Sequence, residues 1–243
     1  MAGLFSADAW EKVWTFRGTF FLGVEHTLMT AVFALFISLL LGIAFGLMST
    51  GRNKALRAIA RVYVEFIQNT PLLLQICFLY YALAFSGNSI GIIATGIIAL
   101  GVYHGAYVAE VIRAGIEAIP KGQFEAAESQ GFDYFQKMYY IILPQSVKII
   151  LPPMVNQVVN LVKNTSCLYI IGGTDLISVT YSFVTGASTG GAYAPAYLLS
   201  GLLFFVICFP LSTLASVWEN SLKKRDARAV SYTHLTLPTI CSV

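Results

Sequence analysis

Long apolar runs separated by short polar segments dominate the chain. Each of five runs has about 20 residues, and a helix of that length crosses the ~30 Å hydrocarbon core of a bilayer. The runs lie near residues 27–48, 66–85, 90–112, 149–171 and 195–217. The pattern therefore predicts an all-α integral membrane protein with five transmembrane helices.

Composition supports this prediction and narrows the class of protein. Of the 243 residues, 57% are hydrophobic and only 11% are charged, whereas soluble domains carry about 25% charged residues. The net charge of +3 is too small to favour nucleic acid as a partner. The four cysteines and three histidines are scattered without any metal-ligand spacing, so we expect no metal site.

Basic residues are distributed unevenly between the two sides of the predicted spans. Apart from Lys12 and Arg17 near the N-terminus, the basic residues that flank the runs lie on one side, as Arg52, Lys54, Arg57, Arg61, then Arg113, Lys121, Lys137, Lys148, and finally Lys223, Lys224, Arg225 and Arg228. The intervals 86–89 and 174–194 contain neither Lys nor Arg. The positive-inside rule therefore predicts an outside N-terminus with an extracytoplasmic segment 1–19, a cytoplasmic interval 114–148 and a cytoplasmic C-terminus.

The polar interval 114–148 is too long for a tight turn, and its inner part predicts two short helices. The first is GQFEAAESQ, with Gly131 placed as a C-terminal stop. The second begins at Asp133, with Gln136 at capping-box spacing. Ala126 and Ala127 would give the first helix a flat methyl surface that another protein can approach closely. The alternative is an ordinary surface loop that contains a helix.

A longer pattern in this interval resembles a known family. Glu125-Ala126-Ala127 is followed by three residues, Gly131, nine residues, and Ile141-Ile142-Leu143-Pro144. This spacing resembles the EAA loop of binding-protein-dependent ABC importer permeases. NTPLLLQICFLYYAL (69–83) and NQVVNLVKNTSCLYIIGGTDL (156–176) are similar to the polar amino acid branch of that family. The resemblance covers roughly residues 18–220.

The resemblance implies a type I ABC importer permease fold, with an ABC transmembrane type-1 domain over residues 20–218. It implies that residues 114–148 form the coupling loop that docks on a cytoplasmic ABC ATPase dimer. The residues assigned to that coupling are Glu125, Ala126, Ala127, Gly131, Leu143 and Pro144. The chain itself would bind no cofactor, because ATP and Mg would be used by the ATPase.

The same resemblance implies the remaining partners and the location. These are a second permease subunit, identical or similar, an extracytoplasmic solute-binding protein, a polar amino acid as substrate, and membrane lipid. The expected location is the bacterial plasma membrane, crossed several times. Another small polar solute remains an alternative substrate.

We do not expect the chain to be an enzyme, because the sequence contains no GxxxxGK[ST] phosphate-binding loop. Two other classes of membrane protein are less favoured. An ion-coupled secondary transporter would show repeated halves and carboxylates near the centre of a span. A membrane anchor for a redox complex would show paired His or Cys ligands within the spans.

Polar residues inside the predicted spans are candidates for a substrate pathway. Asn156, Asn160 and Lys163 recur at i, i+4 and i+7 of the fourth span, where Asn164 and Thr165 extend the stripe. The stripe either lines a pathway or joins helices by polar contacts.

Two further positions, His104 and Tyr107, belong to the same candidate pathway. His104 lies at mid-depth and either faces substrate or hydrogen-bonds a neighbouring helix. Tyr107 shares a face with Tyr103 and Glu110, and Glu110 is expected to pair locally with Arg113.

Asn69-Thr70-Pro71 interrupts the backbone hydrogen bonds of the second span near its expected inner end. The carbonyls freed there either meet a polar solute or are satisfied by Asn69 and Thr70 themselves.

The end of the chain differs in character from the rest. Residues 219–230 form a basic segment, whereas SYTHLTLPTICSV (231–243) is uncharged and apolar. We interpret 231–243 as a non-native tail and leave it out of the functional argument.

Overall fold

The computed structural model describes residues 6–88, 90–187 and 191–235, with side chains described up to residue 221. Every regular element within these residues is helical, which confirms the predicted all-α class. The elements are α1 (Ala7–Thr15), α2 (Arg17–Thr50), α3 (Lys54–Gln68), α4 (Leu72–Phe85), α5 (Ile92–Glu117), α6 (Lys121–Ser129), α7 (Tyr134–Lys137), a π-helix (Met138–Ile142), α8 (Leu143–Asn164), a 3-10 helix (Thr165–Ile171), α9 (Leu176–Thr185) and α10 (Tyr193–Leu235).

Four helical segments of the described chain are long and apolar enough to cross a membrane. They are α2, α5, the continuous run Tyr134–Ile171, and α10 over Tyr193–Ser221. These four segments contain the predicted spans 27–48, 90–112, 149–171 and 195–217, except that residues 90 and 91 lie just before α5. A fifth span exists only if α3 and α4 are counted together, because a bend of 100° separates them.

The expectation of one continuous second span over 66–85 is wrong. Pro71 has no backbone N–H and stands between α3 and α4. The Asn69 amide and the Thr70 hydroxyl donate to carbonyls in the last turn of α3, at 2.7 and 2.9 Å. The amide of Gln75 donates to a third carbonyl of that turn at 3.1 Å. The carbonyls freed at the break are therefore satisfied by nearby side chains, which is the second of the two alternatives given by the sequence.

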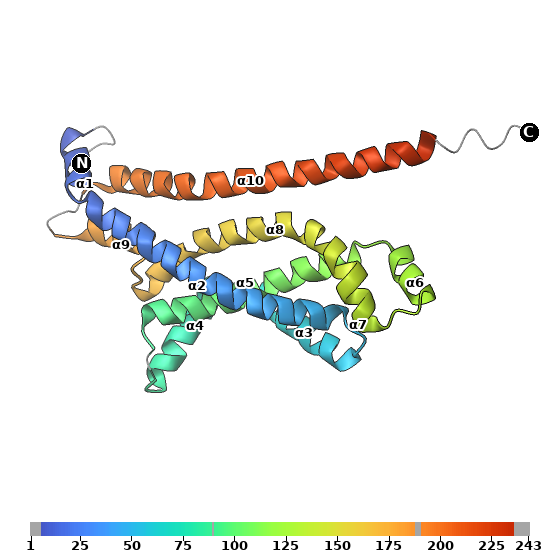
Figure 1. Ribbon diagram of the computed structural model, residues 1–243. Coiled ribbons are helices and arrows are strands. Elements are labelled where there is room, and N and C mark those ends of the chain that lie inside the picture. The colour runs from blue at the N-terminus through green and yellow to red at the C-terminus, as the bar shows by residue number, and fades with distance from the viewer. Residues whose placement is uncertain (1–5, 89, 188–190, 236–243) are drawn as a thin grey trace, which may run out of the picture.

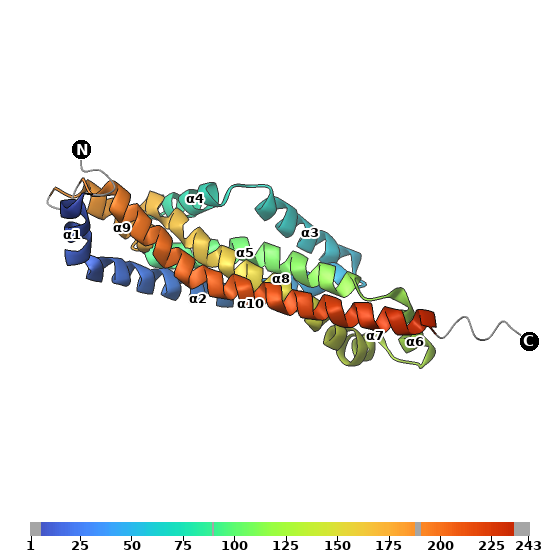
Figure 2. The same ribbon diagram turned by 90° about the horizontal axis from the view of Figure 1, so that it is seen from above.

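Small residues let the two central helices, α2 and α5, approach closely (Figures 1 and 2). A Cβ built on Gly42 of α2 would lie 2.1 Å from a methyl carbon of Val108 on α5, and one on Gly46 would lie 2.9 Å from Ile112. Only glycine fits at these two positions without a backbone shift. Farther along the same two helices, a second core cluster around Ala34 and Leu100 also takes in residues of α4, α8 and α10.

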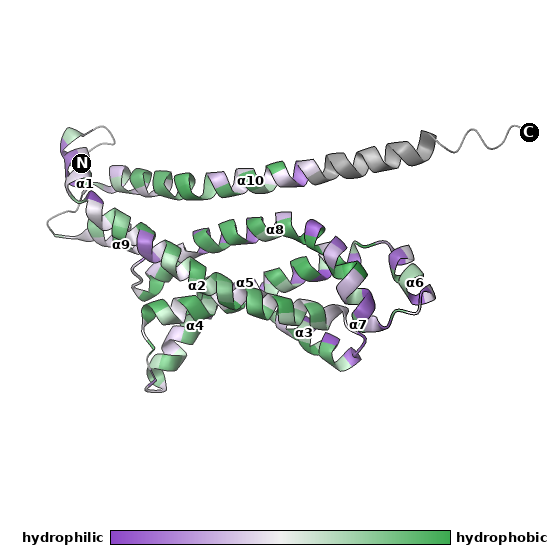
Figure 3. Ribbon diagram, viewed as in Figure 1, coloured by the Kyte–Doolittle hydropathy of each residue, from purple (hydrophilic) through white to green (hydrophobic). Residues whose placement is uncertain are grey.

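The two ends of the molecule differ in polarity. Apolar residues cover the long helices, whereas polar residues gather on α6 and α7, which protrude at one end (Figure 3). The helices α1 and α9 lie at the opposite end (Figures 1 and 2). An apolar belt with one polar end is the surface that a membrane protein presents to lipid and water. The larger part of the predicted non-native tail, 236–243, lies outside the described residues.

Candidate functional site

The polar end is built from two short helices whose boundaries are set by local hydrogen bonds. The first, α6, ends where Gly131 takes a φ of +80°. The Gly131 N–H donates to the carbonyl of Glu128 at 3.0 Å, and the Phe132 N–H donates to the carbonyl of Ala127 at 3.1 Å. This pair of bonds is a Schellman motif, and it confirms the helix stop predicted at Gly131.

The second helix of the polar end, α7, begins with the predicted capping box. The Asp133 carboxylate accepts from the Gln136 N–H at 2.8 Å, and the Gln136 side chain accepts from the Asp133 N–H at 3.0 Å. The helix then continues through the π-helix into α8, with Pro144 in the first turn of α8. The polar end is therefore joined directly to a membrane-spanning helix.

The exposed face of α6 differs from the expected one. Glu125 and Ala126 are exposed, but Ala127 is only 2% exposed and faces the body of the protein. The prediction that both alanines form an approach surface is therefore wrong for Ala127, because the rotation of about 100° between consecutive helical residues places it on the inner face. Leu143 packs in the apolar cluster beneath the loop, and Pro144 is exposed.

An aromatic residue that the sequence reasoning missed lies on the same end. Phe135 of α7 is 80% exposed, and Tyr139 and Tyr140 are exposed on the π-helix that follows. Exposed aromatic side chains next to a flat helix are typical of protein interfaces. The signal in the sequence was a Phe at an otherwise polar turn of a capped helix.

Of the five residues of the polar stripe predicted on α8, three are exposed. Asn156, Asn160 and Lys163 are all exposed on one face of the helix. Thr165 is 0% exposed, and its hydroxyl donates to the carbonyl of Val162 at 2.8 Å. Asn164 is half-buried and turns toward α5. The extension of the stripe to Asn164 and Thr165 is therefore wrong, because the last turn rotates them inward.

His104 occupies the space between α5 and α8. It is 2% exposed, and its Nε2 lies 3.1 Å from the Asn164 amide nitrogen. In this structure His104 therefore contacts a neighbouring helix, the second of the two alternatives given by the sequence, and its place in a pathway stays a prediction. On the neighbouring face the Tyr103 and Tyr107 hydroxyls are hydrogen-bonded at 3.0 Å, and both residues are half-buried.

Lys163 lies at the edge of a cavity of about 320 Å³ between α8 and α10. Aromatic residues of α10, among them Phe204, Phe205 and Phe209, line the other side. No carboxylate among the described residues lies within ion-pair distance of Lys163. A cation without a counter-ion in apolar surroundings has a high free-energy cost, which pairing with a ligand or with another subunit would lower.

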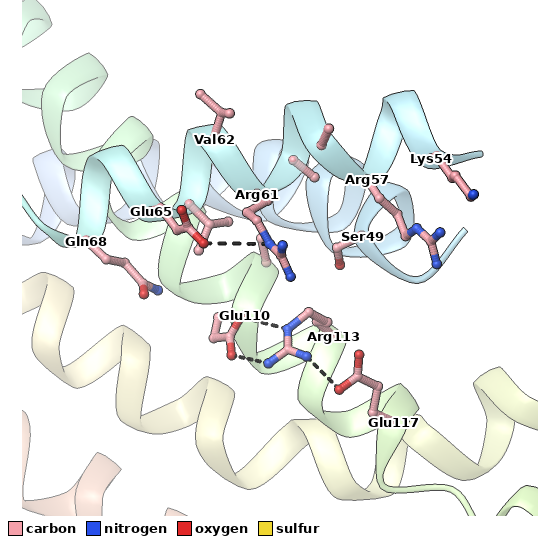
Figure 4. A pocket seen from close by; sticks show the side chains of 14 residues that line it. Ser49, Lys54, Arg57, Arg61, Val62, Glu65, Gln68, Glu110, Arg113 and Glu117 are labelled. Atoms are coloured by element: carbon pink, nitrogen blue, oxygen red, sulfur yellow. Dashed lines mark hydrogen bonds and ion pairs between the residues drawn. The ribbon is translucent and has the colours of Figure 1, made fainter. Parts of the chain in front are cut away.

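A larger cavity of about 800 Å³ lies between α3 and the end of α5 nearest the polar end. Figure 4 shows the two helices presenting charged side chains to the space between them. Its charged lining residues are Lys54, Arg57, Arg61, Glu65, Glu110, Arg113 and Glu117. Sequence reasoning missed this site because the second span was expected to begin at residue 66. The signal was the recurrence of Lys54, Arg57, Arg61 and Glu65 at helical spacing.

The charges on the α5 side of this cavity are paired. Arg113 donates to both oxygens of Glu110 at 2.9 and 2.6 Å, and to Glu117 at 2.5 Å. This confirms the predicted local pair of Glu110 and Arg113. On the α3 side, Arg61 lies 3.6 Å from Glu65 without a hydrogen bond.

Comparison with known proteins shows the family of the chain. Residues 38–224 match the family described as binding-protein-dependent transport system inner membrane component. The chain is 41% identical over 202 residues to the "Probable glutamine ABC transporter permease protein GlnM" of Bacillus subtilis, covering 83% of this chain and 92% of that protein. It is 36% identical over 194 residues to the "Probable glutamine ABC transporter permease protein GlnP" of the same organism, covering 79% and 88%.

A solved structure agrees with these relatives in fold and sequence. A chain of the "Crystal structure of an amino acid ABC transporter with histidines" superposes with a TM-score of 0.79 at 32% identity, covering 86% of this chain and 96% of that chain. A chain of the MetNI methionine ABC transporter shares the fold at a TM-score of 0.62 and 18% identity. The chain therefore belongs to the family of binding-protein-dependent inner membrane components and is a permease of an ABC importer.

Proposed function

We propose that this permease imports a polar amino acid and receives the energy of ATP hydrolysis through its polar end. The substrate class is supported by relatives named as glutamine permeases and by a structural neighbour named as an amino acid transporter. In this proposal the residues over 125–144 dock on a separate cytoplasmic ATPase dimer, which binds the ATP and Mg.

The observation that carries the coupling role is the protruding pair of helices α6 and α7. Both helices are fixed by their own caps, and α7 runs without interruption into the spanning helix α8. Glu125 and Ala126 are free to meet a partner. A partner that pushes on this end therefore moves α8, which bears the exposed stripe of Asn156, Asn160 and Lys163.

The same stripe supports a second permease subunit as a partner. A lysine that faces hydrocarbon at the centre of a span costs about 2.5–3.5 kcal/mol. That cost is avoided where the α8 stripe faces a water-filled pathway between two permeases. On α5, Tyr103, Tyr107 and Glu110 recur at helical spacing, and Glu110 lines the charged cavity between α3 and α5.

The orientation that suits this function places the polar end in the cytoplasm and the N-terminus outside, with residues 1–19 as an extracytoplasmic segment. A solute-binding protein then delivers the amino acid to the end formed by α1 and α9. The uneven distribution of Lys and Arg supports this orientation. Single cysteines at Gln130 and Ala187, on a background lacking Cys77, Cys167, Cys208 and Cys241, test it. An impermeant thiol reagent should label Ala187→Cys from outside, and labelling of Gln130→Cys from outside would contradict the orientation.

The transport activity is tested by reconstitution. Proteoliposomes that contain this permease, its ATPase and the solute-binding protein should accumulate labelled glutamine only when ATP is present on the ATPase side. Accumulation driven by an ion gradient in vesicles without the ATPase would indicate a secondary transporter and contradict the proposal. ATP-dependent uptake of a different small polar solute, with glutamine excluded, would correct the substrate alone.

A further inference from the structure

The helix that offers the docking face, α6, is held to the body by few contacts. Ala127 is buried and Phe124 is half-buried, whereas most other residues of the helix are exposed. Beyond these contacts, the Gln145 amide of α8 donates to the Gln123 side chain at 3.2 Å, and the ionic attachment centres on Glu128. Because so little apolar surface fixes α6, its position depends on these charges more than is usual for a packed helix.

The first charge that meets Glu128 is Lys137 of α7. Lys137 is only 5% exposed, although lysine is almost never buried in proteins. Its ammonium donates to the Glu128 carboxylate and lies 5.7 Å from the centre of the Phe124 ring. Both partners of Lys137 therefore belong to α6. Lys137 lies immediately before the π-helix that continues into α8.

The second charge is Arg52, in the turn between α2 and α3. Its guanidinium lies 4.0 Å from the Glu128 carboxylate and 5.4 Å from the centre of the Tyr134 ring. The next residue, Asn53, caps α3 by accepting from the Ala55 N–H at 2.9 Å. Arg52 therefore links α6 to the start of the helix that lines the charged cavity.

We propose that Glu128 is the junction through which movement of α6 reaches the membrane, by way of Lys137 to α8 and of Arg52 to α3. Lys137 and Arg52 are then positioning residues of the transport cycle. The two routes end at the two polar surfaces of the permease, the α8 stripe and the cavity between α3 and α5. This inference rests on the proposed docking of the ATPase at α6.

The electrostatics of the junction suit a permanent link. The hydrogen bond from Lys137 lowers the pKa of Glu128 below its ordinary value, with a smaller contribution from the charge of Arg52. The carboxylate is therefore ionised throughout the neutral range. The two cations differ in burial, because the Arg52 side chain is 74% exposed. Loss of Lys137 should therefore matter more than loss of Arg52.

The asymmetry of burial decides which variants are informative. Glu128→Gln leaves the buried Lys137 ammonium without a counter-ion, so it is expected to lower the yield of folded protein. Lys137→Met removes the buried charge and leaves only an exposed carboxylate, so the fold should survive. Lys148→Met is a matched control, because Lys148 is exposed at the start of α8.

The experiment is to purify Lys137→Met, Lys137→Arg, Arg52→Gln and Lys148→Met with the ATPase and to reconstitute each complex. The ATPase retained, the ATP hydrolysed and the amino acid taken up are measured on the same vesicles. Lys137→Met should retain the ATPase and hydrolyse ATP, but take up at least about tenfold less amino acid per ATP. Arg52→Gln should take up about two- to threefold less amino acid per ATP than wild type. Lys137→Arg, which keeps the positive charge, should keep most of the wild-type uptake per ATP.

Three results would overturn the proposal. The first is coupling in Lys137→Met equal to that of Lys148→Met. The second is a Lys137→Arg variant as uncoupled as Lys137→Met, since the charge would then be irrelevant. The third is loss of the ATPase from Lys137→Met, because Lys137 would then serve docking and not transmission. None of these results contradicts the docking of the ATPase on Ala126, which has a separate test.

Discussion

The two polar regions of this permease are built in opposite ways. The polar end, α6 and α7, closes its own hydrogen bonds within a few residues, through the Schellman motif at Gly131 and the capping box at Asp133. The α8 stripe leaves Asn156, Asn160 and Lys163 exposed in the part of the chain that should lie in lipid. The first region satisfies its own backbone groups, whereas the second exposes polar side chains that, in the function we propose, face another permease subunit or the substrate.

Among the substitutions that test this comparison, we expect the largest effect at Gly131 of the polar end. The residue has a φ of +80°, where a β-branched side chain is strongly disfavoured, although a Cβ there would meet nothing within 4 Å. Gly131→Val should therefore disturb the end of α6 and lower ATPase association by at least about tenfold, with a conformational cost of roughly 1–2 kcal/mol. Co-purification of the ATPase measures the effect. Gly131→Asn, which tolerates this conformation, should stay close to wild type, and equal retention by the valine variant would contradict the account.

The role of the α8 stripe is tested at Lys163. Lys163→Met removes the exposed charge without disturbing the core, so assembly with the ATPase should be normal while uptake falls several-fold. Relief of a membrane burial cost of about 2.5–3.5 kcal/mol should also leave thermal stability equal or higher. Uptake by reconstituted complexes and the melting temperature are both measured. Unchanged uptake would show that Lys163 has no task in transport.

A substitution of His104 should have a smaller effect on uptake than one in the α8 stripe, and should act on stability instead. His104→Ala removes the contact with Asn164 and leaves a half-buried amide without this partner beside a cavity, so it should lower stability by about 1–3 kcal/mol. Uptake per assembled complex should stay near wild type. His104→Gln, which can still reach Asn164, serves as the control. If His104→Ala had normal stability but lost uptake, His104 would be part of the substrate pathway, which would contradict this prediction.

The sequence predicted the polar end well because its determinants are local. A helix stop at Gly131 and a capping box from Asp133 to Gln136 depend on residues within one or two turns of each other. The same is true of the Glu110–Arg113 pair. Four of the five spans could be placed for a similar reason, since apolar length alone defines them.

The errors concern positions that depend on packing between distant segments. Periodicity gives a helix its faces but does not say which face meets the body, so Ala127 was placed outside and Thr165 in the pathway. The break at Pro71 was recognised, but the amphipathic α3 before it was not counted as part of the second span. Lys137 gave no signal, because a buried lysine and a surface lysine look alike in a sequence.

The central claim is that α6 docks on the ATPase, and bulk at its exposed alanine tests this most directly. Ala126→Trp and Ala187→Trp place the same side chain at exposed positions at opposite ends of the molecule. Each variant is purified from membranes with the ATPase, and the ratio of ATPase to permease is measured. The account predicts a normal ratio for Ala187→Trp and a loss of at least about tenfold for Ala126→Trp, since steric exclusion from a packed interface typically exceeds 1.4 kcal/mol. An equal ratio for the two variants, with uptake intact, would contradict docking at α6.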